Sequence, residues 1–223
     1  HALQIMEQMP SGEALRVQHV VKSGIACSYF WDSAFSLLGL GLIGDLDVAR
    51  NLVRLLLARH GDDGHPVVRV DSGDYLIGVQ QPTLAWGIAR VPGLRDDRAF
   101  LADVYDPLCR YVTWWCENCD SDGNGLVEYP TNGTCWDDAL RWQQGFPITA
   151  AAGQSWADQP WGNSRPPLFD SVDTNVHLCL ECRALALFAD RLNRHAEAQV
   201  WKQRAATIAT QIHKQLYNAE AGV

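Results

Sequence analysis

The chain has 223 residues, 47% of them apolar, and a net charge of −8. This is enough apolar material for a large hydrophobic core. The acidic balance, without any block of Lys or Arg, argues against a nucleic-acid partner and against an anionic membrane surface. No apolar run reaches the length of a membrane span.

The N-terminal part of the chain predicts an antiparallel helical hairpin. Apolar residues recur at helical spacing from Ser33 to Ile43 and from Asp47 to His60. A short Gly-Asp connection joins the two stretches, and Gly61 supplies a C-terminal stop. The expected buried faces are Ala34, Leu37, Leu38 and Leu42, then Val48, Leu52, Leu55 and Leu56.

Two further helix pairs follow. Pro82 to Val91 predicts a helix opened by its proline, and Asp97 to Glu117 carries the clearest apolar stripe, with Pro107 as a potential kink. The third pair is Val172 to Leu192 and His195 to Leu216. The stripe of the first long helix is Leu101, Val104, Tyr105, Leu108, Val112, Trp115 and Cys116, and the last helix is expected to bury Val200, Trp201, Ala205, Ile208 and Ile212. Strand-like alternation is nearly absent, so we predict an all-α fold of six helices in three hairpins.

The segment from Asn118 to Asp170 lacks helical periodicity and is rich in Gly, Pro, Asn, Asp and Trp. Irregular segments of this length inside compact domains are usually functional. We therefore expect the chemistry to lie there.

An acidic loop opens this segment. In the run DSDGNGLVE, oxygen ligands fall at Asp120, Asp122, Asn124 and Glu128, the backbone carbonyl of Leu126 fills a gap, and Gly125 permits a sharp turn. This spacing predicts a structural Ca²⁺ site. The loop departs from an EF-hand because its twelfth position is Thr131, and a polar turn without an ion is the alternative.

The run TCWDDALRW places two adjacent carboxylates, Asp137 and Asp138, beside Trp136, Arg141 and Trp142. Glycoside hydrolysis needs a carboxylic acid that keeps its proton near neutral pH, and a poorly solvated aromatic setting provides one. The alternative is a solvated turn whose acids cap a helix.

Two other segments carry candidate sugar-binding residues. The run SYFWDSAF contains Tyr29, Trp31 and Asp32, and a Trp-Asp pair can stack on a sugar ring and bond its hydroxyl groups. An N-cap beside a packed tryptophan is the alternative. Gln81 precedes Pro82 at an expected helix start, which is by itself an ordinary arrangement.

Taken in order, these motifs resemble glycoside hydrolase family 63 and its relatives, the family 37 trehalases and the bacterial mannosylglycerate-hydrolase-like enzymes. The resemblance runs from about Tyr29 to the end of the chain. The matching positions are Trp31-Asp32, Gln81-Pro82, Asp120 to Leu126 with Glu128, Asp137 to Trp142, and Val172-Asp173 with Asn175.

The resemblance implies an inverting glycosidase on an (α/α)6 barrel of paired helices, with an oligosaccharide or small glycoside, most often an α-glucoside, as its substrate. It makes Asp137 the general acid. Its sugar pocket would be lined by Tyr29, Trp31, Asp32, Gln81, Trp136, Asp138 and Arg141. About half of the barrel is expected in residues 1–223, as the N-terminal part of one catalytic domain. The general base and the other helices are expected outside this chain.

One departure from the family pattern leaves alternatives open. The family often has a glutamate where this chain has Gly133. A non-catalytic carbohydrate-binding protein on the same barrel is therefore one alternative. Alignment on the Trp-x-Asp-Ala pattern of glycogen-debranching enzymes would instead make Asp138 the acid.

The cysteines suggest a different kind of site. Cys116, Cys119, Cys179 and Cys182 form two Cys-x-x-Cys pairs, which could hold zinc in an interaction module. Several cysteines lie in helical apolar stretches, which favours buried free thiols and a reducing, cytoplasmic compartment. A helical-repeat scaffold is less consistent with the sequence, because no fixed period recurs.

Overall fold

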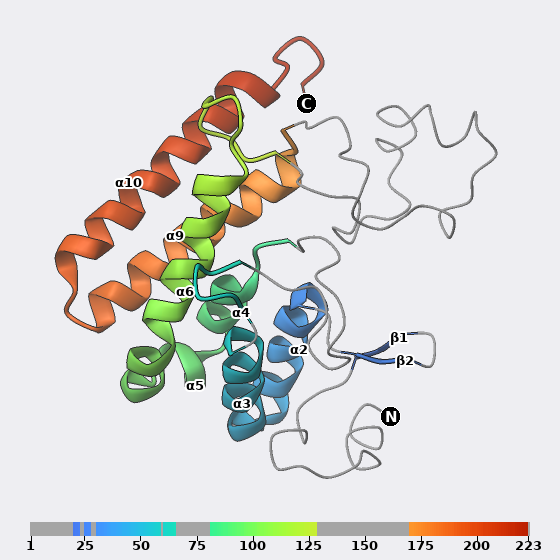
Figure 1. Cartoon of the computed structure of the whole chain (residues 1–223), viewed down its shortest axis with the longest axis vertical. Helices are drawn as coiled ribbons and strands as arrows, with labels where there is room; N and C mark the ends of the chain where they lie inside the picture. The colour runs from blue at the N-terminus through green and yellow to red at the C-terminus, as the bar shows by residue number, and fades with distance from the viewer. Residues whose placement is uncertain are drawn as a thin grey trace.

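The computed structural model describes residues 20–22, 25–27, 30–58, 60–65, 81–128 and 170–222 (Figure 1). The helices are α2 (Phe30–Ile43), α3 (Leu46–Leu57), α4 (Leu84–Arg90), α5 (Pro92–Arg95), α6 (Arg98–Asn118), α9 (Val172–Arg191) and α10 (His195–Gln211), and the π-helix η3 (Ile212–Leu216) continues α10. A short hairpin pairs β1 (Val20–Lys22) with β2 (Ile25–Cys27) in antiparallel register. The all-α class is confirmed. The hairpin and α5 were not predicted, because elements of three or four residues are too short for their periodicity to be recognised.

The predicted hairpin of α2 and α3 is present with shifted ends. Gly44 makes the turn with φ +80°, and the side chain of Asp45 accepts a hydrogen bond from the backbone N–H of Val48. Helix α2 begins three residues before Ser33, and α3 ends at Leu57 instead of His60. Leu42 is 89% exposed, so its predicted burial was wrong. It lies one turn beyond half-buried Leu38, at the edge of the buried face.

The helices form two layers. In the first, α4 packs between α2 and α9. In the second, α6 packs beside α3 and also contacts α9 of the first layer. Helices α9 and α10 run as a long antiparallel pair (Figure 1). Val200 on α10 is 60% exposed although it was predicted to be buried with Trp201. Consecutive residues lie about 100° apart around a helix, so the two cannot share one narrow face.

The core lies between the two layers, and α6 and α9 contribute more buried residues to it than the other helices. Six of the seven residues in the predicted apolar stripe of α6 are buried, and Cys116 is half-buried. The helix runs through Pro107 without a break. Arg50 and Arg54 of α3 form ion pairs with Asp97, the N-cap residue of α6, and with Asp103 of α6, with nitrogen–oxygen distances of 2.9 and 2.6 Å. These pairs hold α3 and α6 together within the second layer.

Among the described residues, no helix is both long and apolar enough to cross a bilayer.

Candidate functional site

The N-terminal ends of α2, α4 and α9 meet at one end of the first layer. Gln81 lies three residues before α4, and its Nε2 donates to Asp173 Oδ2 at 3.2 Å, while its Oε1 lies 3.2 Å from His177 Nδ1. The ring centroids of Trp31 and His177 are 5.8 Å apart. Three segments distant in sequence therefore place Trp31 and Gln81, two of the predicted sugar-binding residues, around one histidine.

Gln81 is 1% exposed, so its hydrogen bonds are made in a site with little solvent. Burial lowers the pKa of His177, although the nearby Asp173 carboxylate opposes this shift. Because the amide oxygen of Gln81 only accepts hydrogen bonds, Nδ1 of His177 is the donor in this pair. The segment that carries Gln81 is held by polar contacts as well as by packing.

Three aromatic side chains pack against one another at this end of the molecule. Trp31 packs edge-on against Phe35 with centroids 4.9 Å apart, and Phe35 packs against Trp86 at 5.6 Å. Phe35 is 40% exposed, and Trp31 and Asp32 are half-buried in the first turn of α2. The two residues thus lie inside α2 instead of just before it, because the helix begins at Phe30.

Glu181 lies two turns along α9 from Asp173 and is fully buried. Its carboxylate accepts hydrogen bonds from the backbone N–H groups of Ala85 at 3.0 Å and Trp86 at 2.7 Å. Burial raises its pKa to about 7, while these two hydrogen bonds act in the opposite direction. The side chain of Thr83, the N-cap residue of α4, makes no capping bond, so Glu181 supplies the acceptor that this helix end needs.

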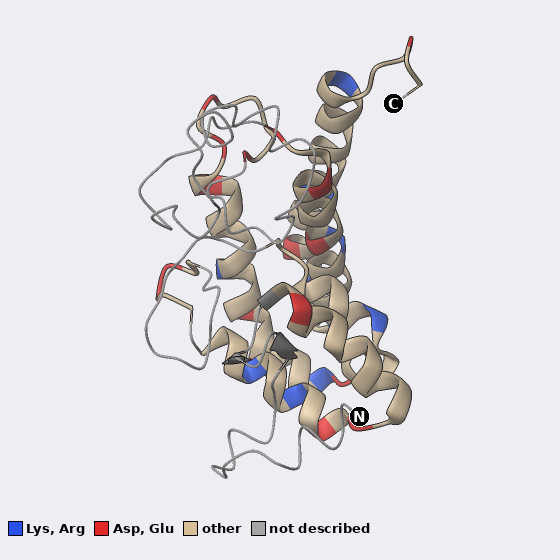
Figure 2. Cartoon of the chain, turned by 90° about the vertical axis from the view of Figure 1, so that its right-hand side faces the viewer, with Lys and Arg blue, Asp and Glu red and all other residues tan. Residues whose placement is uncertain are grey.

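The acidic loop follows α6 and folds onto itself. Asp120 accepts from the backbone N–H groups of Asn124 at 3.1 Å and Gly125 at 3.0 Å, and Asn124 Oδ1 accepts from the N–H of Leu126 at 2.8 Å. Gly123 and Gly125 have φ of +71° and +85°, so the sharp turn predicted at Gly125 is present. Figure 2 shows the acidic residues gathered along this loop.

Glu128 and Asp170 connect the two ends of the irregular segment. They form an isolated antiparallel bridge, and Asn124 Nδ2 donates to Asp170 Oδ2 at 2.8 Å. Burial is the main cause that raises the pKa of Asp170, and the neighbouring carboxylates add to it. Both oxygens of Glu128 accept from Ser121. The loop is thereby held beside the start of α9.

The described ranges contain no group of three or more His, Cys, Asp or Glu side chains placed to hold a metal. The four cysteines of the zinc hypothesis are free thiols, and Cys179 Sγ donates to the backbone oxygen of Ala205 at 3.4 Å. The zinc alternative therefore has no support in this structure.

The remaining predicted residues lie outside the described part of the chain. These are Tyr29, Trp136, Asp137, Asp138 and Arg141. The structure therefore brings together Trp31 and Gln81 and orders the loop from Asp120 to Glu128. Sequence reasoning missed His177 and Asp170. His177 could have been found, because Asp173, His177 and Glu181 recur at every fourth position of a predicted helix. No motif in the sequence indicated Asp170.

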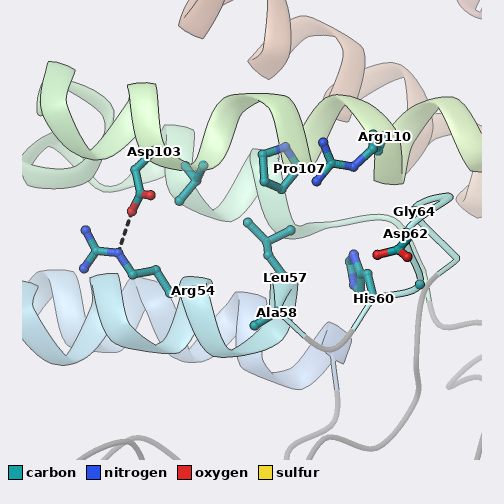
Figure 3. A pocket seen from close by; sticks show the side chains of 11 residues that line it. Arg54, Leu57, Ala58, His60, Asp62, Gly64, Asp103, Pro107 and Arg110 are labelled. Carbon is teal, nitrogen blue, oxygen red and sulfur yellow. Dashed lines mark hydrogen bonds and ion pairs between the residues drawn. The ribbon is translucent and has the colours of Figure 1, made fainter.

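A separate cleft of about 450 Å³ lies between α3 and α6 (Figure 3). Arg54 and Asp103 face each other from the two helices, and Arg110 and Pro107 line the α6 side. His60 closes one end, and burial lowers its pKa to about 4. None of the predicted sugar-binding residues lines this cleft.

Known proteins resemble this chain in sequence and in structure. The family model of the mannosylglycerate hydrolase MGH1-like glycoside hydrolase domain matches residues 28–223. An uncharacterized protein of Saccharomyces cerevisiae, YMR196W, is 30% identical over 107 residues, which is 44% of this chain and 9% of the yeast protein.

Solved structures from Thermus thermophilus share the fold. A GH63 mannosylglycerate hydrolase in complex with Tris has a TM-score of 0.74 at 16% identity, and the match covers 99% of this chain and 65% of that enzyme. The same kind of enzyme in complex with glucose has a TM-score of 0.65 at 17% identity, over 91% and 59%. An uncharacterized conserved protein has a TM-score of 0.72 at 18% identity, over 99% and 64%.

The chain thus spans about two thirds or less of the solved structures it matches and a small part of the yeast relative. Its helices form part of an (α/α) barrel of the glycosidase type. Because the family model covers most of its length, the chain belongs to the mannosylglycerate hydrolase MGH1-like glycoside hydrolase domain family.

Proposed function

We propose that the protein containing this chain is an inverting glycoside hydrolase that cleaves an α-glycosidic bond, with an α-glucoside as its first candidate substrate. Family membership supports the reaction class. A neighbour of the same fold binds glucose, and the neighbours that are named enzymes act on mannosylglycerate, so α-mannosides belong among the candidates.

One structural observation carries the proposal. The starts of α2 and α4 place the half-buried ring of Trp31 and the amide of Gln81 around His177. An aromatic face and a fixed amide are the groups that pack on a sugar ring and bond its hydroxyl groups. This end of the first layer is therefore the proposed sugar pocket, with Asp32, Tyr29, Trp136, Asp138 and Arg141 as further lining residues.

In the proposed reaction, Asp137 protonates the glycosidic oxygen as the bond to the anomeric carbon breaks. A second carboxylate removes a proton from water, whose oxygen bonds to the opposite face of that carbon. Inverting enzymes place the two carboxyl groups about 6.5–9.5 Å apart to admit this water. We propose that the second carboxylate comes from the part of the domain that corresponds to the third of the neighbours' length left uncovered here.

We also propose that the loop from Asp120 to Glu128 binds a structural Ca²⁺ ion through Asp120, Asp122, Asn124, Glu128 and the carbonyl of Leu126. In the described structure these side chains do not converge on one point, so the proposal requires them to turn from their present hydrogen bonds towards the ion. Side-chain and backbone oxygens are the ligands that Ca²⁺ prefers. In support, Asp170 Oδ1 is buried without a hydrogen-bond partner in the described structure, and burial, together with the neighbouring carboxylates, raises the pKa of Asp170. A divalent cation would offset this concentration of negative charge. It would contribute stability to the loop and takes no part in the proposed reaction.

The test of the reaction is hydrolysis by the complete protein of a panel of α-glucosides, trehalose and mannosylglycerate. Asp137→Asn is expected to abolish turnover and to retain sugar binding. Asp138→Asn tests the debranching-type alternative. Asp47→Asn is the matched control, because the Asp47 side chain is 93% exposed on α3. Sugar binding by the wild type without hydrolysis of any compound would favour a carbohydrate-binding protein that lacks the family glutamate at Gly133.

A further inference from the structure

Three residues at every fourth position of α9 contact one segment at the start of α4. Asp173 accepts from Gln81 Nε2, and His177 Nδ1 lies 3.2 Å from Gln81 Oε1. Glu181 accepts from two backbone N–H groups in the first turn of α4. Side chains four residues apart lie on the same helix face. One face of α9 therefore contacts both the side chain of Gln81 and the helix that follows it.

These contacts define the orientation of the Gln81 amide. An ionised carboxylate only accepts hydrogen bonds, so Nε2 of Gln81 faces Asp173. With Nε2 bonded to Asp173, Oε1 lies 3.2 Å from Nδ1 of His177, and because an amide oxygen only accepts, Nδ1 is the donor. A rotated amide would place its oxygen against the carboxylate and its NH₂ group against the imidazole N–H, which loses both bonds in a site that is nearly fully buried.

The backbone that carries this amide is fixed as well. Pro82 follows Gln81, and both residues are buried. The carboxylate of Glu181 holds the first turn of α4 by two hydrogen bonds of 3.0 and 2.7 Å. Contacts within the protein therefore fix both the start of α4 and the orientation of the Gln81 amide.

We propose that Asp173 and His177 are positioning residues, which hold the Gln81 amide in one orientation at the proposed sugar pocket. Glu181 holds the helix start on which this arrangement depends. The inference rests on the proposed function, in which Gln81 contacts the sugar. Asp173 and His177 act through Gln81 and need not touch the sugar themselves.

The test is a double-mutant cycle in the complete protein, with glucose binding measured by calorimetry. His177→Phe keeps an aromatic ring near Trp31 and removes the donor. It is expected to weaken the Kd for glucose about tenfold, the size expected from one lost hydrogen bond. In a Gln81→Ala background the same change is expected to have less than about a twofold effect, because a residue that acts through Gln81 has nothing left to orient. Asp173→Asn is expected to follow the same pattern.

Arg183→Gln is the control, since Arg183 is exposed on the same helix and is expected to leave the Kd unchanged. Equal effects of His177→Phe in both backgrounds would overturn the inference. So would an unchanged Kd in Gln81→Ala together with a weakened one in His177→Phe.

A second readout needs no sugar and separates this inference from the proposed function. The side-chain NH₂ signals of Gln81, identified by their loss in Gln81→Ala, are expected to exchange slowly with solvent in the wild type. Asp173→Asn and His177→Phe should accelerate that exchange at least about tenfold. Fast exchange in the wild type would overturn the inference even in a protein that cleaves glycosides. Slow exchange in a protein that neither binds nor cleaves sugars would support the orientation and defeat the proposed function.

Discussion

The side-chain amide of Asn175 makes hydrogen bonds to both backbone groups of Val127. Asn175 Oδ1 accepts from the N–H of Val127 and Nδ2 donates to its C=O, each at 2.8 Å, and the asparagine is fully buried. One residue of α9 thus satisfies both backbone hydrogen-bonding groups of a loop residue that lies 48 positions earlier in the chain. The acidic loop is attached to the helix layer through this pair.

Asn175→Ala is expected to destabilise the protein by about 2 kcal/mol, because it leaves two buried backbone groups without partners. Asn51→Ala is the control, since Asn51 is exposed on α3 and its replacement should change stability by less than about 0.5 kcal/mol. Chemical denaturation of both variants measures the difference. Equal stability of the two variants would show that the loop attachment contributes nothing.

Glu181 is expected to give stability a distinct pH dependence. Its pKa rises from 4.5 to about 7 on folding, mainly through burial. Between these values the folded state holds a proton that the unfolded state has lost, so the free energy of unfolding falls as the pH rises. Thermal unfolding measured from pH 4.5 to 7.5 should show a smaller fall in Glu181→Gln than in the wild type. Glu197→Gln, at an exposed site on α10, should keep the wild-type slope.

The helices could be predicted from sequence because their apolar periodicity is long and regular. The clearest case is α6, whose stripe from Leu101 to Trp115 is buried as expected. Helix ends were less predictable. The N-terminus of α4 has no side-chain cap of its own, and its acceptor comes from Glu181, 96 residues after Ala85. The sequence around Ala85 therefore does not indicate this partner.

The candidate site could be predicted only in part, because some of its contacts join segments that are distant in the sequence. Trp31 and Gln81 were found by their resemblance to family motifs, and the structure places them around one histidine. His177 shares a four-residue spacing with Asp173 and Glu181, but its contact with Gln81 becomes visible only through the packing of α9 against α4. Asp170 joins the acidic loop through a bridge to Glu128 and a hydrogen bond from Asn124, which lies 46 positions earlier in the chain, and no local pattern indicates such partners.

Gly64 is expected to tolerate no side chain. Its φ is +89°, and a Cβ atom there would lie 2.4 Å from the backbone oxygen of Arg110 on α6. Gly64→Ala should therefore introduce about 1–3 kcal/mol of backbone strain, which should lower the Tm by several degrees. Gly39→Ala is the matched control. A Cβ atom there meets no neighbouring atom within 4 Å, and alanine favours the helix by up to about 1 kcal/mol.

Calcium is expected to stabilise the acidic loop. Adding Ca²⁺ to protein treated with a chelator should raise the Tm of the wild type, because the ion binds the folded loop and not the unfolded chain. Asp122→Asn should reduce this rise, whereas Asp47→Asn should leave it intact. If Ca²⁺ has the same small effect on the wild type and on Asp122→Asn, the loop is a polar turn without an ion.

The central claim is that the protein is an inverting glycosidase with Asp137 as its acid. Proton NMR of the first sugar released from an α-glucoside or α-mannoside by the complete protein tests it most directly. The account predicts that the β-anomer forms first and slowly equilibrates with the α-anomer, and that Asp137→Asn releases no sugar. Release of the α-anomer first, or undiminished release by Asp137→Asn, would contradict it.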